Sequence, residues 1–319
     1  MLLWQKAMIA LARSESMTRR MQGSPRMDRF ASRYVGGHDA AGGLERAVVL
    51  RGEGMNASLF YLGEYVEDPA EIRVTLDALR ETAAKLAPAG LDVHISVDPT
   101  QIGAMRSWDD CLENARTLAQ ALAEQAAAKP EPGRDALMID MEDSSVTGPT
   151  LKLYRTLHNE GLPVAVTLQA YLRRTRVDLD ALVETGAMVR LVKGAFAEPR
   201  DKAFTSRRER DDAYRRCIAT LLSPKARERG VYPVFGTHDD RMIDLATHIA
   251  AANGWKADEW EVEMLLGVRP DYQRELVARG VSLRLYLPFG KDWWPYSIRR
   301  VGENPRNMLF VMRSMLGGK

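Results

Sequence analysis

Short, nearly continuous apolar runs alternate with longer amphipathic stretches along most of this chain. Apolar runs of this length are typical of strands that are buried on both faces of a sheet. Eight of them occur, at residues 58–63, 92–98, 137–141, 164–170, 188–194, 233–238, 260–265 and 283–289. The pattern therefore predicts eight buried strands.

The stretches between the predicted strands place their apolar residues at helical spacing. The predicted helices cover residues 69–86, 108–128, 148–159, 177–185, 201–222, 239–253 and 270–279, and another follows from Asp292. Prolines stand where helices are expected to begin and glycines where they are expected to end. These residues are Pro69, Pro199, Pro270, Gly186, Gly254 and Gly280.

Eight strand–helix repeats favour a closed parallel barrel over an open sheet. An open doubly wound sheet would carry a GxGxxG turn after its first strand, and the sequence has none there. We therefore predict an α/β protein with a single (β/α)8 TIM-type barrel over residues 46–319. Residues 1–45 are predicted as an N-terminal helical extension with a glycine-rich link, and residues 36–43 are expected to form a loop.

The composition of the 319-residue chain is that of an ordinary globular protein, with 45% hydrophobic and 28% charged residues. The formal net charge is +2 and basic residues are mixed with acidic ones, so we expect no nucleic-acid partner. Long apolar runs are missing, and a membrane-spanning helix is not predicted. The two cysteines lack metal-binding or redox spacing, which favours a reducing, cytoplasmic location.

Residues 1–20 are amphipathic and somewhat basic. This pattern favours a helix packed on the outside of the domain over a targeting peptide, because Glu15 interrupts the segment and no cleavage site is evident. Contact between this segment and a membrane surface is a further interpretation.

Polar side chains recur where the predicted strands end, and barrel enzymes of this class build their active sites there. Arg190 and Lys193 share one core strand, and buried charges are costly unless they have partners. We interpret them either as paired interior charges or, preferably, as a site for an anionic ligand or cofactor. The polar strand ends are Glu64, Asp98, Asp140, Glu142, Gln169, Arg190, Lys193, His238 and Glu263.

A second group of candidates follows the last predicted strand. On a helix, Tyr296 would lie within one turn of both Arg299 and Arg300, and Glu303 is spaced to pair with either arginine. Adjacent arginines beside aromatic residues suit the bidentate capture of a carboxylate. An exposed basic helix face is the alternative interpretation.

The residues at these positions resemble the proline dehydrogenase family, the flavin-dependent barrels that oxidise L-proline. The resemblance runs from about residue 59 to the C-terminus, and the length is similar to that of the short, monofunctional bacterial members. The most specific stretches are LMIDMEDS at 137–144, LQAYL at 168–172, VRLVKGAF at 189–196, GTHD at 236–239 and YSIRRVGE at 296–303.

The resemblance implies non-covalently bound FAD at the strand ends, with Arg190 near flavin N5, and it implies no metal. The expected catalytic residues are Arg190, Asp140 and Asp98. The residues expected to bind the cofactor are Gln169, Arg190, Lys193, Gly194, Ala195, Thr237 and His238. The residues expected at the substrate are Arg299 and Arg300 on its carboxylate, Glu303 to position them, and Tyr286, Tyr296, Leu265, Ala195 and Asp140 around the pocket.

The implied reaction is hydride transfer from the ring carbon beside the proline nitrogen to flavin N5. It yields pyrroline-5-carboxylate and is the first step of proline catabolism. Two guanidinium groups on the substrate carboxylate would fix the ring over the flavin, and cations beside the flavin would stabilise its reduced form. The implied electron acceptor is a membrane quinone, with peripheral contact at the inner membrane.

One position departs from the family pattern. Family members usually end the second strand with lysine, whereas this chain has Asp98, which is expected to lie near Asp140. Two neighbouring carboxylates repel, so one pKa should rise unless a cation intervenes. Three hypotheses follow: oxidation of L-proline, oxidation of a related cyclic amino acid or amine, and a non-catalytic flavoprotein. Phe196 is a milder departure, because it replaces a common tyrosine.

Other interpretations of the same residues stay open at this point. A metal-dependent hydrolase would require clustered ligands, and His94 and His238 are isolated in the sequence. A Schiff-base aldolase would use Lys193 as its nucleophile. His238 is also consistent with a structural hydrogen bond, and Asp140 with an acidic charge at the start of the next helix.

Overall fold

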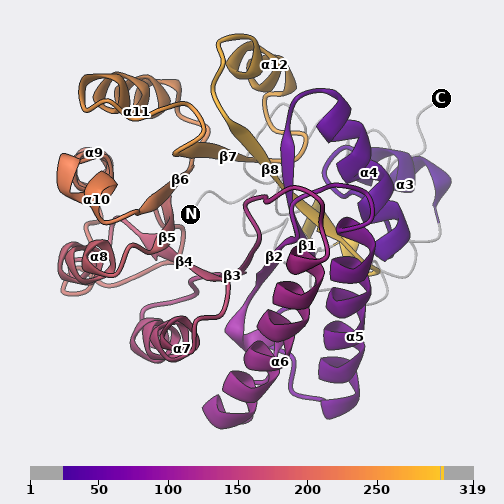
Figure 1. The fold of residues 1–319 in the computed structure, drawn as a ribbon. Helices are drawn as coiled ribbons and strands as arrows, with labels where there is room; N and C mark the ends of the chain where they lie inside the picture. Colours follow the sequence, from indigo (N-terminus) through magenta and orange to yellow (C-terminus); the bar gives the residue numbers. More distant parts are fainter. Residues whose placement is uncertain (1–23, 295, 298–319) are drawn as a thin grey trace.

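The centre of the molecule is a closed barrel of eight parallel strands in sequential order (Figure 1). The computed structural model describes residues 24–294 and 296–297. β8 closes the barrel by pairing with β1, where Leu59 lies opposite Leu287. The predicted (β/α)8 barrel is confirmed. The strands are β1 Asn56–Tyr61, β2 His94–Val97, β3 Ala136–Ile139, β4 Val164–Gln169, β5 Met188–Val192, β6 Tyr232–Gly236, β7 Glu261–Leu265 and β8 Leu283–Phe289.

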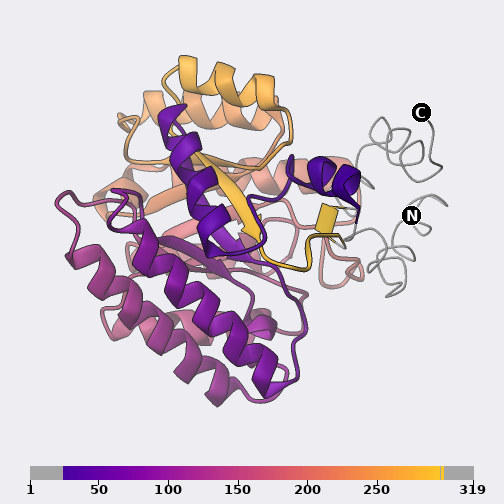
Figure 2. The same ribbon diagram turned by 90° about the vertical axis from the view of Figure 1, so that its right-hand side faces the viewer.

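Helices surround the strands on the outside of the barrel (Figures 1 and 2). Within the described residues, no helix is long and apolar enough to cross a bilayer. The described helices are α3 Pro25–Ala31, α4 Ala40–Gly52, α5 Pro69–Leu86, the short 3-10 helix η1 Pro99–Gln101, α6 Trp108–Ala127, α7 Thr147–Asn159, α8 Thr175–Glu184, α9 Arg207–Leu221, α10 Pro224–Glu228, α11 Asp240–Ala252 and α12 Pro270–Ala278.

Most helices begin and end where the local sequence supplies capping groups. Ahead of α5, the Asp68 side chain accepts a hydrogen bond from the Ala70 amide, and Pro69 is the first helical residue. Ser206 and Glu209 form a reciprocal capping box at the start of α9. The glycines predicted to follow helices adopt the left-handed backbone that favours glycine, with φ of 67° at Gly186, 73° at Gly254 and 76° at Gly280.

The main apolar core lies between the strands and the surrounding helices. It includes Leu79 and Ala83 of α5 together with Ile95 of β2, all of them fully buried. A smaller apolar cluster joins Met138 of β3 to Ala165 of β4. Many other buried strand positions are polar or charged, and they are Ser58, His94, Ser96, Thr167, Gln169, Arg190, Glu261, Glu263 and Arg284.

Helix α4 corrects the prediction of a loop at residues 36–43. The helix starts at Ala40, so Gly43 is helical, whereas residues 36–39 lie outside the helix as predicted. A Cβ atom at Gly43 would lie only 3.3 Å from side-chain atoms of Leu59 and Phe289. Glycine therefore lets α4 pack closely against β1 and β8, which local sequence alone does not distinguish from a flexible link.

The helix predicted at residues 201–222 begins later than expected, at Arg207. Pro199 consequently does not begin a helix, and this prediction is wrong. The residues before α9 instead pair with the connection between β4 and α8, where the Phe204 amide donates to the Tyr171 carbonyl at 2.8 Å. This pairing between distant segments satisfies the backbone groups that a helix would have satisfied. The short helix α10 is a further element that the sequence pattern did not predict.

Residues 36–37, just before α4, lie beside the carboxyl end of β8 (Figure 2). The Gly36 amide donates to the Pro288 carbonyl at 2.8 Å, and the Gly290 amide donates to the Gly37 carbonyl at 2.9 Å. These bonds fix residues 36–37 beside the end of β8. The N-terminal segment therefore borders the end of the barrel where sites form in this fold.

Candidate active site

The Arg190 side chain lies at the centre of a polar group inside the barrel, only 3% exposed. Its guanidinium contacts the carboxylates of Asp140, which follows β3, and Glu263 of β7. Its Nη2 also donates to the hydroxyl groups of Ser58 and Ser96, at 3.2 and 2.9 Å. Burial works against the charge, but the two carboxylates outweigh it and raise the pKa of Arg190. The guanidinium therefore stays charged.

Asp140 accepts hydrogen bonds from residues of three other strands. Its Oδ1 accepts from Arg190 and, at 2.9 Å, from the Thr167 hydroxyl, while its Oδ2 accepts from the Tyr286 hydroxyl at 3.0 Å. The Tyr286 ring lies 5.2 Å from the Arg190 guanidinium carbon and 5.4 Å from the Phe60 ring. Burial, and then the Asp140 charge, raise the pKa of Tyr286 well above its ordinary value. The phenol therefore remains a donor at neutral pH.

A cavity of about 400 Å³ opens beside these groups at the carboxyl ends of the strands. The apolar residues that line it include Met141, Val192, Phe196, Met264 and Leu265. The polar residues that line it include Asp98, Asp140, Thr167, Gln169, Arg190, Lys193, His238, Glu263 and Tyr286. A concave, partly apolar site with a few fixed polar groups is the usual form of a small-molecule or cofactor site.

Lys193 lines the same cavity and is held there by two acids. Its Nζ lies 2.7 Å from a carboxylate oxygen of Asp211 on α9 and 2.7 Å from one of Asp239 before α11. Burial would raise the pKa of Asp239, but the ammonium group of Lys193 outweighs it and the pKa is lowered. Nearby, the His238 Nε2 accepts a hydrogen bond from the Leu265 amide at 2.9 Å, which fixes the ring between β6 and β7.

The wall of the cavity is supported by a buried acid, Glu142. Its carboxylate accepts hydrogen bonds from the Thr100 amide at 3.1 Å and the Thr100 hydroxyl at 2.6 Å. Its carbonyl accepts from the Gln169 side chain at 2.7 Å. Burial raises the pKa of Glu142. These contacts tie together the ends of β2, β3 and β4, so we assign Glu142 a structural position at the rim.

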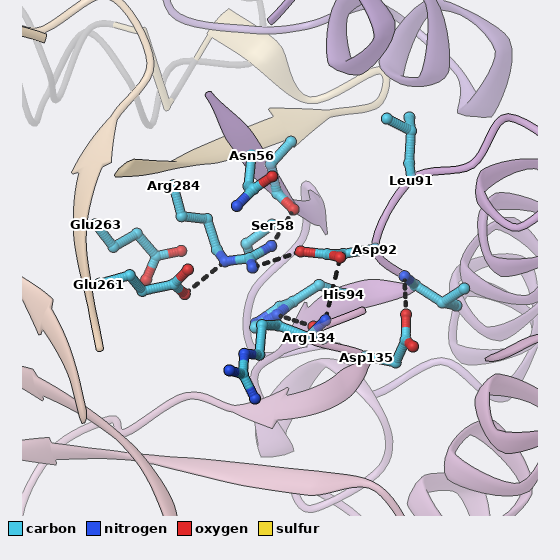
Figure 3. A network of polar contacts seen from close by, with 12 residues as sticks. Asn56, Ser58, Leu91, Asp92, His94, Arg134, Asp135, Glu261, Glu263 and Arg284 are labelled. Carbon is cyan, nitrogen blue, oxygen red and sulfur yellow. Dashed lines mark hydrogen bonds and ion pairs between the residues drawn. The ribbon is translucent and has the colours of Figure 1, made fainter. Parts of the chain in front are cut away.

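A second buried ion cluster lies nearer the amino ends of the strands (Figure 3). Arg284 of β8 donates to Glu261 of β7 at 2.6 Å and to Asp92 at 2.7 Å. Burial would raise the pKa of Asp92, but Arg284 outweighs it and lowers the pKa to about 2. His94 donates to the Arg134 carbonyl at 3.0 Å, and burial followed by Arg284 lowers the His94 pKa, which keeps the ring neutral.

A hollow of about 590 Å³ on the outside of the barrel, between α8 and α9, is larger than the strand-end cavity. Arg173, Arg176, Arg216 and Phe204 are among the residues that line it. Among the described residues that line it there is no carboxylate, whereas two carboxylates hold Arg190 in the strand-end cavity. Chemistry in this fold takes place at the carboxyl ends of the strands, so we place the candidate site in the smaller cavity.

The family model described as proline dehydrogenase matches residues 44–313 of the chain. A proline dehydrogenase of Deinococcus radiodurans is 31% identical over 318 residues, which cover 99% of this chain and 99% of the relative. Proline dehydrogenase 2 of Bacillus subtilis is 32% identical over 285 residues, which cover 89% of this chain and 90% of the relative. The chain belongs to the proline dehydrogenase family. Membership confirms the predicted enzyme class and the predicted activity, the oxidation of proline in the first step of its catabolism.

Solved structures of proline utilization A (PutA) share the fold of this family member. PutA from Bdellovibrio bacteriovorus, inactivated by N-propargylglycine, has a TM-score of 0.80 and 20% identity, covering 95% of this chain. PutA from Corynebacterium freiburgense has a TM-score of 0.73 and 22% identity, also covering 95% of this chain. The chain spans only 36% and 33% of these two longer proteins, and at these identities the likeness shows the fold alone.

The barrel brings most of the predicted site residues of this proline dehydrogenase family member to one cavity. They are Asp98, Asp140, Gln169, Arg190, Lys193, Gly194, Ala195, His238, Leu265 and Tyr286. Thr237 and Tyr296 are buried but do not line the cavity. The Thr237 hydroxyl instead accepts a hydrogen bond from the Asp239 amide. The predicted residues that lie outside the described part of the chain are Arg299, Arg300 and Glu303.

Sequence reasoning missed several groups that hold the predicted ones in place. Glu263 stood out as a polar strand end without a role, and the contacts of Ser58, Ser96 and Thr167 were not predicted. All are polar residues within otherwise apolar strands, and a polar residue that interrupts an apolar run could have identified them as candidates. The acids around Lys193 carried no such signal, because Asp211 and Asp239 lie near helix starts, where acids are common.

Proposed function

We propose that this chain binds FAD in the strand-end cavity and oxidises L-proline there to pyrroline-5-carboxylate. The observation that carries the proposal is the buried Arg190 guanidinium, which two acids hold in the lining of a cavity that also contains apolar residues. A flavin has the matching chemistry, because its ring system is flat and largely apolar but gains negative charge on reduction. The family is flavin-dependent, which supports the same cofactor.

The backbone at two glycines in the cavity lining also suits a bound cofactor. Gly194 lines the cavity with φ of +99°, and a Cβ atom there would lie 2.1 Å from the Tyr171 ring. Gly236 lines it too, and a Cβ atom there would lie 2.8 Å from Val192. Packing against these side chains requires glycine at both positions, and the cavity is therefore lined by bare backbone there, which suits a ring or phosphate group. The residues proposed to hold FAD are Gln169, Arg190, Lys193, Gly194, Ala195, Thr237 and His238.

When bound, FAD would supply a two-electron acceptor for the hydride that leaves the proline ring. Arg190 contributes a fixed positive charge that needs no reorganisation, because Asp140, Glu263 and two hydroxyl groups already hold it. Tyr286 and Asp140 shape the end of the pocket. Because Asp98 lines the same cavity, we propose that its carboxylate binds the amine of the substrate.

The carboxylate of proline would be bound by Arg299 and Arg300, with Glu303 positioning them and Tyr296, Leu265 and Ala195 completing the pocket. Support for the arginine pair is the sequence motif at residues 296–303, which lies within the matched family region. Two guanidinium groups suit planar capture of a carboxylate. They would also orient the ring toward the cofactor, which is the main benefit of binding in a hydride transfer.

A related cyclic amino acid or amine is the second candidate substrate, and Asp98 favours it. The described residues lining the cavity include three carboxylates, Asp98, Asp140 and Glu263, against the cations Arg190 and Lys193. This balance would attract a substrate with more positive charge than proline. For the electron acceptor we propose a membrane quinone reached by peripheral contact, which rests on the resemblance to the family.

An anaerobic reduction screen tests the proposal. The purified protein should be yellow, and L-proline should bleach the flavin absorbance while D-proline leaves it unchanged. Hydroxyproline, pipecolate and N-methylated analogues tested in parallel would reveal the second candidate substrate class. A preparation that holds no flavin and cannot be reconstituted with FAD would contradict the proposed cofactor. A yellow protein that none of these compounds reduces would indicate a flavoprotein without turnover.

A further inference from the structure

Both carboxylate oxygens of Glu263 contact nitrogens of the Arg190 guanidinium. Its Oε2 contacts Nε of Arg190, and its Oε1 accepts from Nη2 at 2.9 Å. The Glu263 side chain is itself 3% exposed, and it lines the cavity. Asp140 contacts the remaining guanidinium nitrogen, Nη1. One cation is therefore held by two carboxylates at the wall of the proposed flavin site.

Arg190 has more carboxylate partners than are needed to hold its guanidinium in place. Asp140 together with the hydroxyls of Ser58 and Ser96 already gives the guanidinium three partners. Among the described residues, the other cation that lines the cavity is Lys193, and it is shared by two acids of its own. In a buried site with a low effective dielectric, an extra carboxylate is felt over several ångströms. Burial raises the pKa of Glu263 and the paired Arg190 counters this rise, so the carboxylate offsets part of the positive charge that Arg190 presents to the cavity.

We propose that Glu263 acts through Arg190 to lower the reduction potential of the bound flavin, an inference that rests on the proposed function. Reduction adds negative charge to the flavin, which Arg190 favours and the Glu263 carboxylate opposes. Glu263 is thus a positioning residue with an electrostatic effect. Replacing it by glutamine keeps the size and an acceptor oxygen but removes the negative charge.

The chain offers a matched control on the same strand. Glu261 lies two residues before Glu263, is likewise buried, and pairs with Arg284 in the cluster near the amino ends of the strands (Figure 3). Glu261 is not among the residues that line the cavity. Glu261→Gln therefore removes one buried carboxylate from an arginine pair of the same kind, without altering the charge beside the cofactor.

The experiment measures the midpoint potential of the flavin in the full-length protein, by anaerobic equilibration with reference dyes. We expect Glu263→Gln to raise the reduction equilibrium constant at least tenfold, which is about 30 mV for a two-electron couple. Glu263→Asp should stay near the native potential because it keeps the charge. Glu261→Gln should lower the melting temperature and leave the potential unchanged. Should the glutamine variant fold poorly, Glu263→Ser carries the same expectation as a smaller neutral side chain.

Three outcomes would overturn the inference. One is an unchanged potential in a flavin-loaded Glu263→Gln protein. Another is an equal shift in Glu261→Gln, because the effect would then not depend on Arg190. The third is loss of flavin from both neutral variants while Glu263→Asp and Glu261→Gln retain it, since Glu263 would then serve binding alone. Absence of flavin from the native protein is a different result, because it would contradict the proposed function itself.

Discussion

The Tyr286 hydroxyl donates to Oδ2 of Asp140 at 3.0 Å, although the two residues lie 146 positions apart in the chain. Tyr286 belongs to β8 and Asp140 follows β3, so the bond crosses the interior of the closed barrel. The other oxygen of the same carboxylate holds Arg190. The position of the proposed catalytic cation therefore depends on a bond between the two halves of the barrel.

Removing that bond should weaken both the fold and the activity. We expect Tyr286→Phe to lower the free energy of unfolding by about 1–2 kcal/mol, because a charged acceptor loses one buried donor. We expect kcat/KM for L-proline to fall roughly tenfold, since 1.4 kcal/mol of transition-state stabilisation corresponds to that factor. Tyr65→Phe is the control, because its side chain is exposed. Equal kinetics and stability in the native protein and in Tyr286→Phe would show that this hydrogen bond does not help to position Asp140 and Arg190.

The Asp92–Arg284 pair should make stability depend on acid pH. The pKa of Asp92 is lowered from 3.8 to about 2 in the folded protein, so its stabilising effect is complete above pH 4 and is lost as the pH falls toward 2. This shift corresponds to about 2 kcal/mol. In denaturant unfolding at several pH values, the stability difference between native protein and Asp92→Asn should shrink by about that amount between pH 5 and pH 2.

Asp271→Asn provides the comparison for this measurement. Asp271 also pairs with an arginine, Arg274, but the Asp271 side chain is 94% exposed. Exposed pairs contribute little, so the stability difference for this variant should be near zero at every pH. If the two variants showed the same pH dependence, burial of the Asp92 pair would not be the cause.

Substitution of Asp98 should distinguish between L-proline and a different cyclic amino acid or amine as the native substrate. If Asp98 binds the amine of proline, Asp98→Asn should raise KM for L-proline about tenfold, as expected for loss of one charge-assisted hydrogen bond. Asp98→Lys should lower turnover further, because it reverses the charge at a position where the site of this chain uses an acid. Steady-state kinetics with L-proline measures both effects. Improved turnover in Asp98→Lys would show instead that the native substrate differs from proline.

The arginine pair of the motif at residues 296–303 should act on the substrate and not on the cofactor. We expect Arg299→Ala and Arg300→Ala each to raise KM for L-proline at least tenfold, because a bidentate contact with the carboxylate is lost. The flavin content per protein, measured by absorbance, should stay at the native level. Unchanged proline kinetics in both variants would remove the carboxylate assignment.

Gly194 should be irreplaceable for two separate reasons. Its φ of +99° strains any other residue, and a Cβ atom would collide with the Tyr171 ring. Gly161 shares a positive φ of +76° but has open space around its Cβ position, so Gly161→Ala isolates the backbone strain. We expect that variant to cost about 1 kcal/mol in denaturant unfolding. Gly194→Ala should cost clearly more and lose flavin. Equal costs would mean that the tyrosine ring moves freely aside.

The alternation of apolar runs and amphipathic stretches was sufficient to predict the barrel, because strands buried on both faces and helices buried on one face have different periods. Polar residues at strand ends were likewise sufficient to locate most of the cavity, since parallel strands in a barrel bring those ends together. Local patterns failed at Gly43 and at Pro199. At Gly43, close packing of α4 outweighs the tendency of glycine to form a loop. After Pro199, pairing of the chain with a distant loop outweighs the tendency of proline to begin a helix.

The sequence by itself thus determined the fold, the family and the end of the barrel that holds the candidate site. Only the tertiary structure decided which acids neutralise which cations: Glu263 and Asp140 for Arg190, Asp211 and Asp239 for Lys193. The physical reason is that ion pairing depends on distance and burial, and these partners lie 18 to 73 positions apart in the chain, so they meet only in the folded barrel. The balance of charge in the cavity is therefore a property of the closed barrel and cannot be read along the chain.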